Sequence, residues 1–160
     1  MDFALITPFK NDGAIDFDAI PKIINHLING GVNYLVVLGT TAESTSLSKD
    51  EKKQLVAAIV ECNAGILPLV IGIGGNNTYQ VIEDIISIDL SPFSAVLSIT
   101  PYYNKPNQEG LYQHFRAIAQ NSSLPVILYN VPSRTGVNLT PETVLRLSKD
   151  FDEIVAIKEA

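Results

Sequence analysis

Residues 34–62 have the sequence YLVVLGTTAESTSLSKDEKKQLVAAIVEC and contain one complete unit of the fold. The opening YLVVL is almost continuously apolar, as expected of a strand that is buried on both faces. After a polar turn, Ser48 and Glu51 have the spacing of a capping box, which opens a helix. Leu55 and Ile59 then recur at helical spacing and predict one apolar face. Strand, turn and helix together occupy about 30 residues, the length of one strand-plus-helix unit.

The same unit recurs along the chain, because short runs rich in Val, Ile and Leu alternate with amphipathic segments. The runs that predict strands are residues 3–6, 34–38, 69–73, 95–99, 126–129 and 154–157. The segments between them predict five helices, which begin near Asp16, Ser48, Thr78, Glu109 and Thr140. We expect Asp16 to cap the first of these helices. Strict alternation of this kind demands a parallel sheet with right-handed crossovers.

Two architectures satisfy this alternation, an open doubly wound sheet and a barrel. An eight-unit barrel needs about 250 residues, whereas the sequence has 160 residues and stops directly after its sixth predicted strand. A complete doubly wound domain more often closes with a covering helix. We therefore expect an α/β fold, a (βα)8 TIM barrel truncated after strand six. Residues 1–160 would form a partial barrel of strands one to six and helices one to five, without the carboxyl-terminal strands and helical region.

Composition and charge exclude several classes of protein. The chain is 46% apolar with a net charge of −6, and no stretch clusters Lys or Arg. Binding to nucleic acid or to an anionic membrane surface is therefore disfavoured. No apolar run approaches the length of a membrane helix, and the amino terminus does not have the pattern of a signal peptide. The single Cys62 cannot form an internal disulfide and suits a reducing compartment, so we expect a cytoplasmic protein.

In parallel α/β proteins the functional side chains gather at the carboxyl ends of the strands. Lys158 follows the apolar run 154–157, and burial there would disfavour its ammonium form and free the amine to attack a carbonyl carbon. Tyr129 ends the preceding strand and could carry protons for that amine. Arg134 lies in a Pro-Ser-Arg-Thr-Gly turn, where its planar fork could hold a carboxylate. Thr40 and Thr41 offer hydroxyls and backbone N–H groups suited to a small carboxylate. Each of these residues, taken alone, is also compatible with a purely structural role.

Other polar features do not point to a site. The Gly72-x-Gly74-Gly75 pattern lacks the third glycine of the dinucleotide fingerprint and the lysine of a P-loop, so it predicts nucleotide binding only weakly. His26 and His114 fall within predicted helices, away from the strand ends, which argues against a metal or catalytic role. Cys62 falls on an apolar helix face and is predicted to be part of the core.

Four motifs resemble those of the 4-hydroxy-tetrahydrodipicolinate synthase (dihydrodipicolinate synthase) family, within the superfamily of pyruvate-dependent Schiff-base aldolases. They are residues 39–44 (GTTAES), 100–104 (TPYYN), 129–136 (YNVPSRTG) and 157–160 (IKEA). The resemblance runs along the whole chain, with the motifs in order. It implies a (βα)8 barrel followed by a helical carboxyl-terminal region, usually assembled as a tetramer of tight dimers. The chain would then be the amino-terminal part of such a protein.

The resemblance also implies a reaction, the condensation of pyruvate with L-aspartate-4-semialdehyde to 4-hydroxy-tetrahydrodipicolinate, in the diaminopimelate route to lysine. This lyase chemistry needs no metal or organic cofactor, because a lysine supplies the electron sink. The resemblance implies that Lys158 supplies the Schiff-base amine and that Tyr129 transfers protons. It implies that Thr40 links Tyr129 to a second tyrosine, Tyr103, which enters the site of a neighbouring subunit. Thr41 would hold the pyruvate carboxylate, and Arg134 would hold the semialdehyde carboxylate.

The sequence departs from the family pattern in three respects. Ala42 replaces the second glycine of the usual Gly-Thr-Thr-Gly-Glu turn, so the backbone there must tolerate a Cβ atom. Lys49, Lys52 and Gln80 stand where lysine-regulated members commonly have histidines and a glutamate, and we expect weak or absent feedback by lysine. The last two strands and the helical region are missing, which would leave unpaired edges, and we expect the 160-residue chain to be catalytically weak or inactive by itself.

Three alternatives remain open from the sequence. Another pyruvate-dependent Schiff-base aldolase, such as N-acetylneuraminate lyase, is disfavoured because a sugar lacks the carboxylate that Arg134 would hold. A non-catalytic oligomerisation or binding module is disfavoured by the intact Lys158 and Tyr129. A nucleotide-binding open α/β domain is the least favoured of the three.

Overall fold

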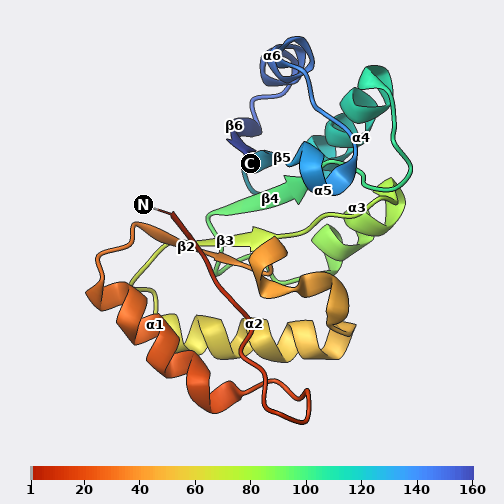
Figure 1. Ribbon diagram of the computed structural model, residues 1–160. Coiled ribbons are helices and arrows are strands. Elements are labelled where there is room, and N and C mark those ends of the chain that lie inside the picture. Colours follow the sequence, from red (N-terminus) through yellow and green to blue (C-terminus); the bar gives the residue numbers. More distant parts are fainter. Residues whose placement is uncertain (1) are drawn as a thin grey trace. The chain divides into compact units, whose positions relative to one another are not determined.

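The computed structural model describes residues 2–160 and contains two compact units (Figure 1). The first unit extends as far as Gly72, and the second spans Ile73–Ala160. Within each unit parallel strands alternate with helices, which confirms the α/β class predicted from the sequence.

The first unit contains three parallel strands that pair in chain order. The strands are β1 (Asp2–Ala4), β2 (Tyr34–Val37) and β3 (Leu69–Gly72). The helical elements are η1 (Phe17–Ala19), α1 (Ile20–Asn29), η2 (Thr40–Ala42), η3 (Ser44–Ser46) and α2 (Lys49–Asn63), where η denotes a single 3-10 turn. Figure 1 shows α1 and α2 side by side, and the two helices are in contact.

The helix starts of this unit confirm one sequence prediction and correct another. At α2 the Ser48 hydroxyl accepts from the backbone N–H of Glu51, whose carboxylate accepts in return from the Ser48 N–H, so the predicted capping box is present. The prediction that Asp16 caps the first long helix is wrong. A 3-10 turn intervenes, α1 begins only at Ile20, and Asp16 makes no side-chain capping bond.

A close approach of backbone segments explains one glycine of this unit. A Cβ atom at Gly72, the last residue of β3, would overlap the carbonyl oxygen of Leu38. Leu38 itself has φ of +57°, a left-handed conformation that turns the chain directly after β2. Only glycine at position 72 therefore lets β3 pass this turn. The turn at Leu38 sets the direction of the polar segment that follows β2.

The second unit contains three more parallel strands, again paired in chain order. The strands are β4 (Ala95–Ile99), β5 (Val126–Asn130) and β6 (Ile154–Glu159). The helices are α3 (Thr78–Ser87), α4 (Gln108–Asn121), α5 (Pro132–Thr135) and α6 (Pro141–Asp150). The one-turn helix α5 was not predicted, because the sequence indicated only a turn there.

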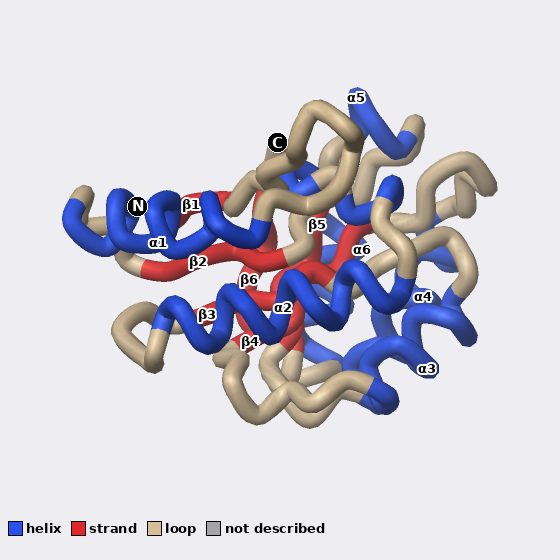
Figure 2. Tube along the Cα trace, turned by 90° about the horizontal axis from the view of Figure 1, so that it is seen from below, coloured by secondary structure: helices blue, strands red, loops and turns tan. Residues whose placement is uncertain are grey.

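Helices α3 and α4 pack against each other, as Figure 2 shows, while α4 also contacts β5 and α6 contacts β6. The apolar face of α4 is fully buried at Leu111, Phe115 and Ile118, and Leu128 of β5 is fully buried as well. His114 of α4 is also buried, and its Nδ1 lies 2.8 Å from the Thr78 hydroxyl. Burial lowers the pKa of His114 to about 4, so the ring is neutral at pH 7.

Candidate active site

Tyr129 and Lys158 are neighbours at the carboxyl ends of β5 and β6. The register pairs Tyr129 with Lys158, so both side chains leave the same face of the sheet. The Lys158 Nζ lies 4.7 Å from the centroid of the Tyr129 ring. Tyr129 is only 6% exposed, whereas Lys158 is half-buried. An amine and a phenol are thereby held side by side, partly shielded from water.

The strand that carries Lys158 is less buried than the sequence analysis assumed. Ile154 at its start is buried, but Val155 is 57% exposed and Ala156 is exposed too. Within residues 2–160 the expected burial around Lys158 is therefore only partly present. Among the described residues β6 pairs only with β5, and helix packing from α6 covers only part of it. An apolar strand is buried on both faces only where neighbours are present on all sides.

The turn after β5 presents Arg134 to solvent. The Thr135 hydroxyl donates to the carbonyl oxygens of Val131 and Val137, at 3.2 and 3.1 Å, and Thr135 is buried. Gly136 has φ of +71° and ends the one-turn helix α5. Arg134 is exposed, and its guanidinium makes no hydrogen bond or ion pair with any residue that the structure describes. A rigid turn with an available guanidinium suits the binding of a carboxylate.

The loop between β4 and α4 presents Tyr103. The side chain is 87% exposed, and its backbone has φ of +70°, which is uncommon for a residue other than glycine. The neighbouring Asn104 side chain donates to the carbonyl oxygen of Asn76 at 2.8 Å and anchors the loop. Strain of this kind is maintained only where the surroundings enforce it, and it concentrates at functional sites.

In the first unit, Thr40 and Thr41 lie in η2 directly after β2, and both are exposed. The turn is fastened by the buried Thr7 hydroxyl, which donates to the Ala42 carbonyl oxygen at 2.6 Å. Ala42 is buried and its φ is not positive, since the left-handed residue of this turn is Glu43, with φ of +52°. The backbone at Ala42 therefore accommodates a Cβ atom without adopting a left-handed conformation.

The remaining sequence candidates lie apart from the strand ends. His114 is in the interior of α4, and His26 is on the exposed side of α1. Cys62 is half-buried in α2, where the buried residue is instead its neighbour Asn63, so the prediction of a core cysteine is only partly met. Residues 2–160 contain no group of three or more His, Cys, Asp or Glu side chains placed to hold a metal ion. None of the helices in the described part of the chain is long and apolar enough to cross a membrane.

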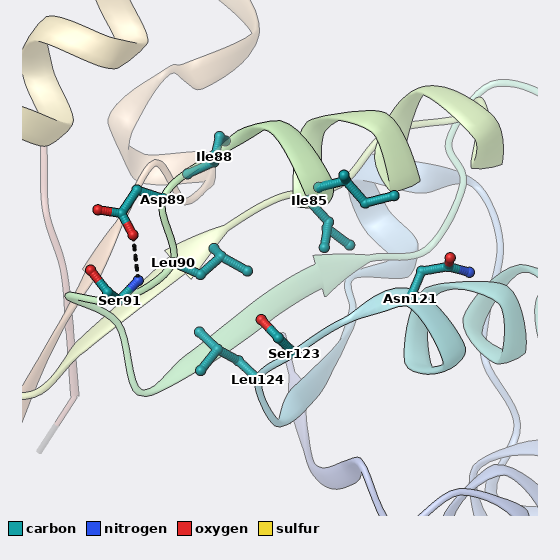
Figure 3. Close-up of a pocket in the computed structure, with 9 residues that line it drawn as sticks. Ile85, Ile88, Asp89, Leu90, Ser91, Asn121, Ser123 and Leu124 are labelled. Carbon is teal, nitrogen blue, oxygen red and sulfur yellow. Dashed lines mark hydrogen bonds between the residues drawn. The ribbon is translucent and has the colours of Figure 1, made fainter.

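An open groove of about 470 Å³ lies at the amino ends of β4 and β5, the opposite ends of these strands from Tyr129 (Figure 3). Its lining is mostly isoleucine and leucine from the ends of α3 and α4 and the segments that follow them. The one carboxylate in it, Asp89, already accepts from the Ser91 N–H at 3.0 Å, as the dashed line in Figure 3 marks, and this bond lowers its pKa. The one carboxylate of the groove is therefore already hydrogen-bonded.

Sequence reasoning assigned no role to Asn130, which the structure places at the centre of the polar contacts behind Tyr129. The residue is 1% exposed, and its side chain bonds to Asn138, Leu139 and Glu159. The motif at 129–136 contains Asn130, but only the register of β5 and β6 identifies its partners. A polar residue inside a buried strand was the signal that could have drawn attention to it.

The fold defines an α/β protein of the (βα)8 barrel family, of which the described residues contain six strands. A lysine and a tyrosine lie at two adjacent strand ends. The model of the Dihydrodipicolinate synthetase family matches residues 2–160, and the chain belongs to this family. A 4-hydroxy-tetrahydrodipicolinate synthase of Flavobacterium psychrophilum is 62% identical over 98% of this chain and 54% of that protein. One of Azobacteroides pseudotrichonymphae is 54% identical over 100% of this chain and 54% of that protein.

Solved structures agree with this assignment. The dihydrodipicolinate synthase of Thermotoga maritima matches with a TM-score of 0.94 and 42% identity, over 99% of this chain and 54% of that chain. The chloride-inhibited dihydrodipicolinate synthase of Acinetobacter baumannii, solved in complex with pyruvate, matches with the same TM-score, identity and coverage. The chain thus spans about half the length of the relatives that it matches.

Proposed function

We propose that the protein to which this chain belongs condenses pyruvate with L-aspartate-4-semialdehyde to 4-hydroxy-tetrahydrodipicolinate, as a lyase of lysine and diaminopimelate biosynthesis. The observation that carries the proposal is the Lys158 amine 4.7 Å from the Tyr129 ring, at adjacent strand ends. Membership of the family and the 62% identity to a relative with this name support the choice of substrates.

In the proposed reaction the Lys158 amine adds to the keto carbon of pyruvate. Loss of one water then forms the imine, and loss of a proton from the methyl carbon forms the enamine. The enamine carbon attacks the aldehyde carbon of the semialdehyde, and the amino group of that substrate displaces Lys158 as the ring closes. Tyr129 carries the protons to and from the oxygen and carbon atoms of these steps. The lysine itself is the electron sink, so no step uses a metal or organic cofactor.

The other candidates receive the roles that the family resemblance implies. Arg134 holds the semialdehyde carboxylate, which fits its exposed guanidinium on a rigid turn. Thr41 holds the pyruvate carboxylate, and Thr40 links Tyr129 to a second tyrosine. Tyr103 is that second tyrosine, supplied to another copy of the chain, which fits its 87% exposure. The proposal therefore includes a homo-oligomer, a tetramer of tight dimers in the whole protein, located in the cytoplasm, in which residues 1–160 form one partial barrel.

The test is the intact mass of the protein after incubation with pyruvate and borohydride, with the labelled peptide mapped. Two chains are compared, namely the 160-residue chain and an extended chain. The extended chain continues this sequence past Ala160 with the carboxyl-terminal part of the Flavobacterium psychrophilum relative. We expect one pyruvate, less one water and plus two hydrogens, on Lys158. The Lys158→Arg variant should not be labelled, whereas the matched Lys149→Arg variant should be labelled like the parent.

The outcomes separate the alternatives. Labelling of the extended chain alone supports the chemistry and shows that the missing part is needed for it. A failure of both chains to label contradicts the proposal. If Lys158 is labelled, aspartate-4-semialdehyde and N-acetylmannosamine are compared as acceptors, and turnover with the sugar alone would assign the protein to the neuraminate lyases instead.

Feedback by lysine is part of the same proposal. Lys49, Lys52 and Gln80 stand where lysine-regulated members commonly have histidines and a glutamate, and cationic side chains repel a lysine ligand. We expect the extended chain to keep its activity in the presence of lysine. Inhibition at low lysine concentration would contradict this expectation.

A further inference from the structure

Asn130 uses every polar group of its side chain in contacts to two other segments. Its Nδ2 donates to the Asn138 Oδ1 at 2.7 Å and to the Glu159 carboxylate at 3.0 and 3.3 Å. Its Oδ1 accepts from the Leu139 N–H at 3.0 Å. The side chain is nearly fully buried, and such a group is retained in an apolar sheet only when its hydrogen bonds are satisfied.

The two segments are the ones that carry proposed site residues. Glu159 directly follows Lys158 in β6, and Asn130 directly follows Tyr129 in β5. Asn138 and Leu139 follow the one-turn helix that carries Arg134. The Asn130 carbonyl oxygen also accepts from the Ala160 N–H at 3.1 Å, so backbone and side chain of Asn130 both bind the end of β6. Asn130 thus ties the strand of Tyr129 both to the strand of Lys158 and to the segment beyond Arg134.

Side chains alternate along a strand, so the hydrogen bonds of Asn130 lie on the face of the sheet opposite to Lys158 and Tyr129. Tyr129 and Lys158 point to one face of the sheet, and Asn130 and Glu159 point to the other. Asn130 therefore does not touch a substrate that lies on Lys158. Any effect of Asn130 on a reaction there has to act through the relative position of the amine, the phenol and the guanidinium.

We infer that Asn130 is a positioning residue, which holds Lys158 and the Arg134 turn in register with Tyr129. This inference rests on the function proposed above. The bonds from Asn130 to Glu159, together with the bond from the Ala160 N–H to the Asn130 carbonyl oxygen, hold the end of β6 beside Tyr129. Misplacement of a reacting group by about 1 Å costs on the order of 100-fold in rate.

The experiment measures kcat and the KM for pyruvate, together with the rate of borohydride trapping, in the extended chain. Asn130→Ala should lower kcat and the trapping rate by about 10- to 100-fold, while the KM for pyruvate changes by less than about threefold. Glu159→Ala removes one of the three partners of the Asn130 side chain and should lower kcat by a smaller factor. Glu159→Gln keeps an acceptor for the Asn130 amide and should leave kcat within about twofold of the parent.

A reversed pair distinguishes positioning from general destabilisation. Asn130→Asp removes the donor and sets a carboxylate against Glu159, so kcat should fall. The Asn130→Asp/Glu159→Gln double variant exchanges donor and acceptor, and it should recover a large part of the lost kcat. The matched control is Asn63→Ala, which removes another buried asparagine, bonded only to the Leu67 backbone. It should lower the thermal unfolding midpoint and leave kcat per folded protein unchanged.

Thermal unfolding and near-UV circular dichroism establish the folded fraction of each variant. An unchanged kcat in Glu159→Ala and in folded Asn130→Ala would overturn the inference, as would failure of the reversed pair to recover activity. If Asn130→Ala does not fold, Glu159→Ala and the reversed pair still decide it. A parent chain that is not labelled by pyruvate would contradict the proposed function, and this inference with it. A labelled parent with unaffected variants would overturn this inference alone.

Discussion

β5 and β6 lie side by side and have similar apolar sequences, VILYN and IVAIKE, yet they differ in burial. β5 pairs with a strand on each side and is covered by α4, and Leu128 and Tyr129 are buried. β6 has one described strand neighbour, and Val155 is 57% exposed. An apolar run therefore supplies the capacity to be buried, and the neighbouring elements decide whether it is buried. The proposed site combines one residue from each environment.

The largest expected effect compares a buried and an exposed apolar side chain on these strands. Leu128→Ala should lower the free energy of unfolding by about 3–4 kcal/mol, because the side chain is fully buried and leaves a cavity. Val155→Ala should cost less than about 0.5 kcal/mol in the 160-residue chain. Urea unfolding of both variants measures the difference. Equal losses would show that β6 is as well packed as β5.

A pH-dependent effect should follow from the burial of His114 in the helix over β5. Its pKa is about 4 in the folded chain, against an ordinary value of about 6.5, so only the unfolded chain takes up this proton between these pH values. Stability should therefore fall as the pH falls from about 6.5 to about 4, by up to about 3 kcal/mol, and this group should cause no further loss below pH 4.

Urea unfolding from pH 7 to pH 4 tests the role of His114. His114→Gln should remove most of this pH dependence. His26→Gln, which replaces the exposed histidine, should keep it. Loss of the dependence in the His26 variant instead would show that the buried ring is not its source.

The carboxyl-terminal part of the extended chain should cover β6 and thereby raise the rate at which Lys158 reacts with pyruvate. In the extended chain we expect the initial rate of imine trapping to exceed that of the 160-residue chain by about 100-fold, because shielding from water and fixed positions of Lys158 and Tyr129 both favour the reaction. The same mass measurement, taken over time, gives both rates. Similar rates in the two chains would show that β5 alone positions the amine.

The smallest effect concerns the link between the helices over β5 and β6. The Arg146 guanidinium of α6 donates to the Glu109 carboxylate of α4 at 2.6 Å, and it also lies 3.5 Å from the centroid of the Tyr112 ring. The pKa of Glu109 is lowered, first by the hydrogen bond from Arg146. Both side chains are exposed, so Glu109→Gln should lower the urea midpoint only slightly, and added salt should abolish the difference. A difference that persists at high salt would contradict an electrostatic origin.

The sequence by itself determined the α/β class, because strand runs and amphipathic segments alternate at a period that only parallel strands with helical crossovers satisfy. It also determined the capping box at Ser48, since a cap depends on residues three apart. The motifs around Thr40, Tyr103, Tyr129, Arg134 and Lys158 indicated the candidate site, because carboxyl ends of parallel strands collect functional residues. Their catalytic roles stay predictions until the labelling experiment is done.

Only the tertiary structure decided what depends on partners distant in the sequence. The exposure of β6 follows from the elements beside it, which no periodicity reveals. The start of α1 at Ile20 depends on a 3-10 turn that competes with a cap at Asp16. The register that sets Tyr129 beside Lys158, and Asn130 beside Glu159, joins residues that are 29 positions apart in the sequence. A strand pattern predicts that a residue faces one side of a sheet, but only packing selects its neighbour there.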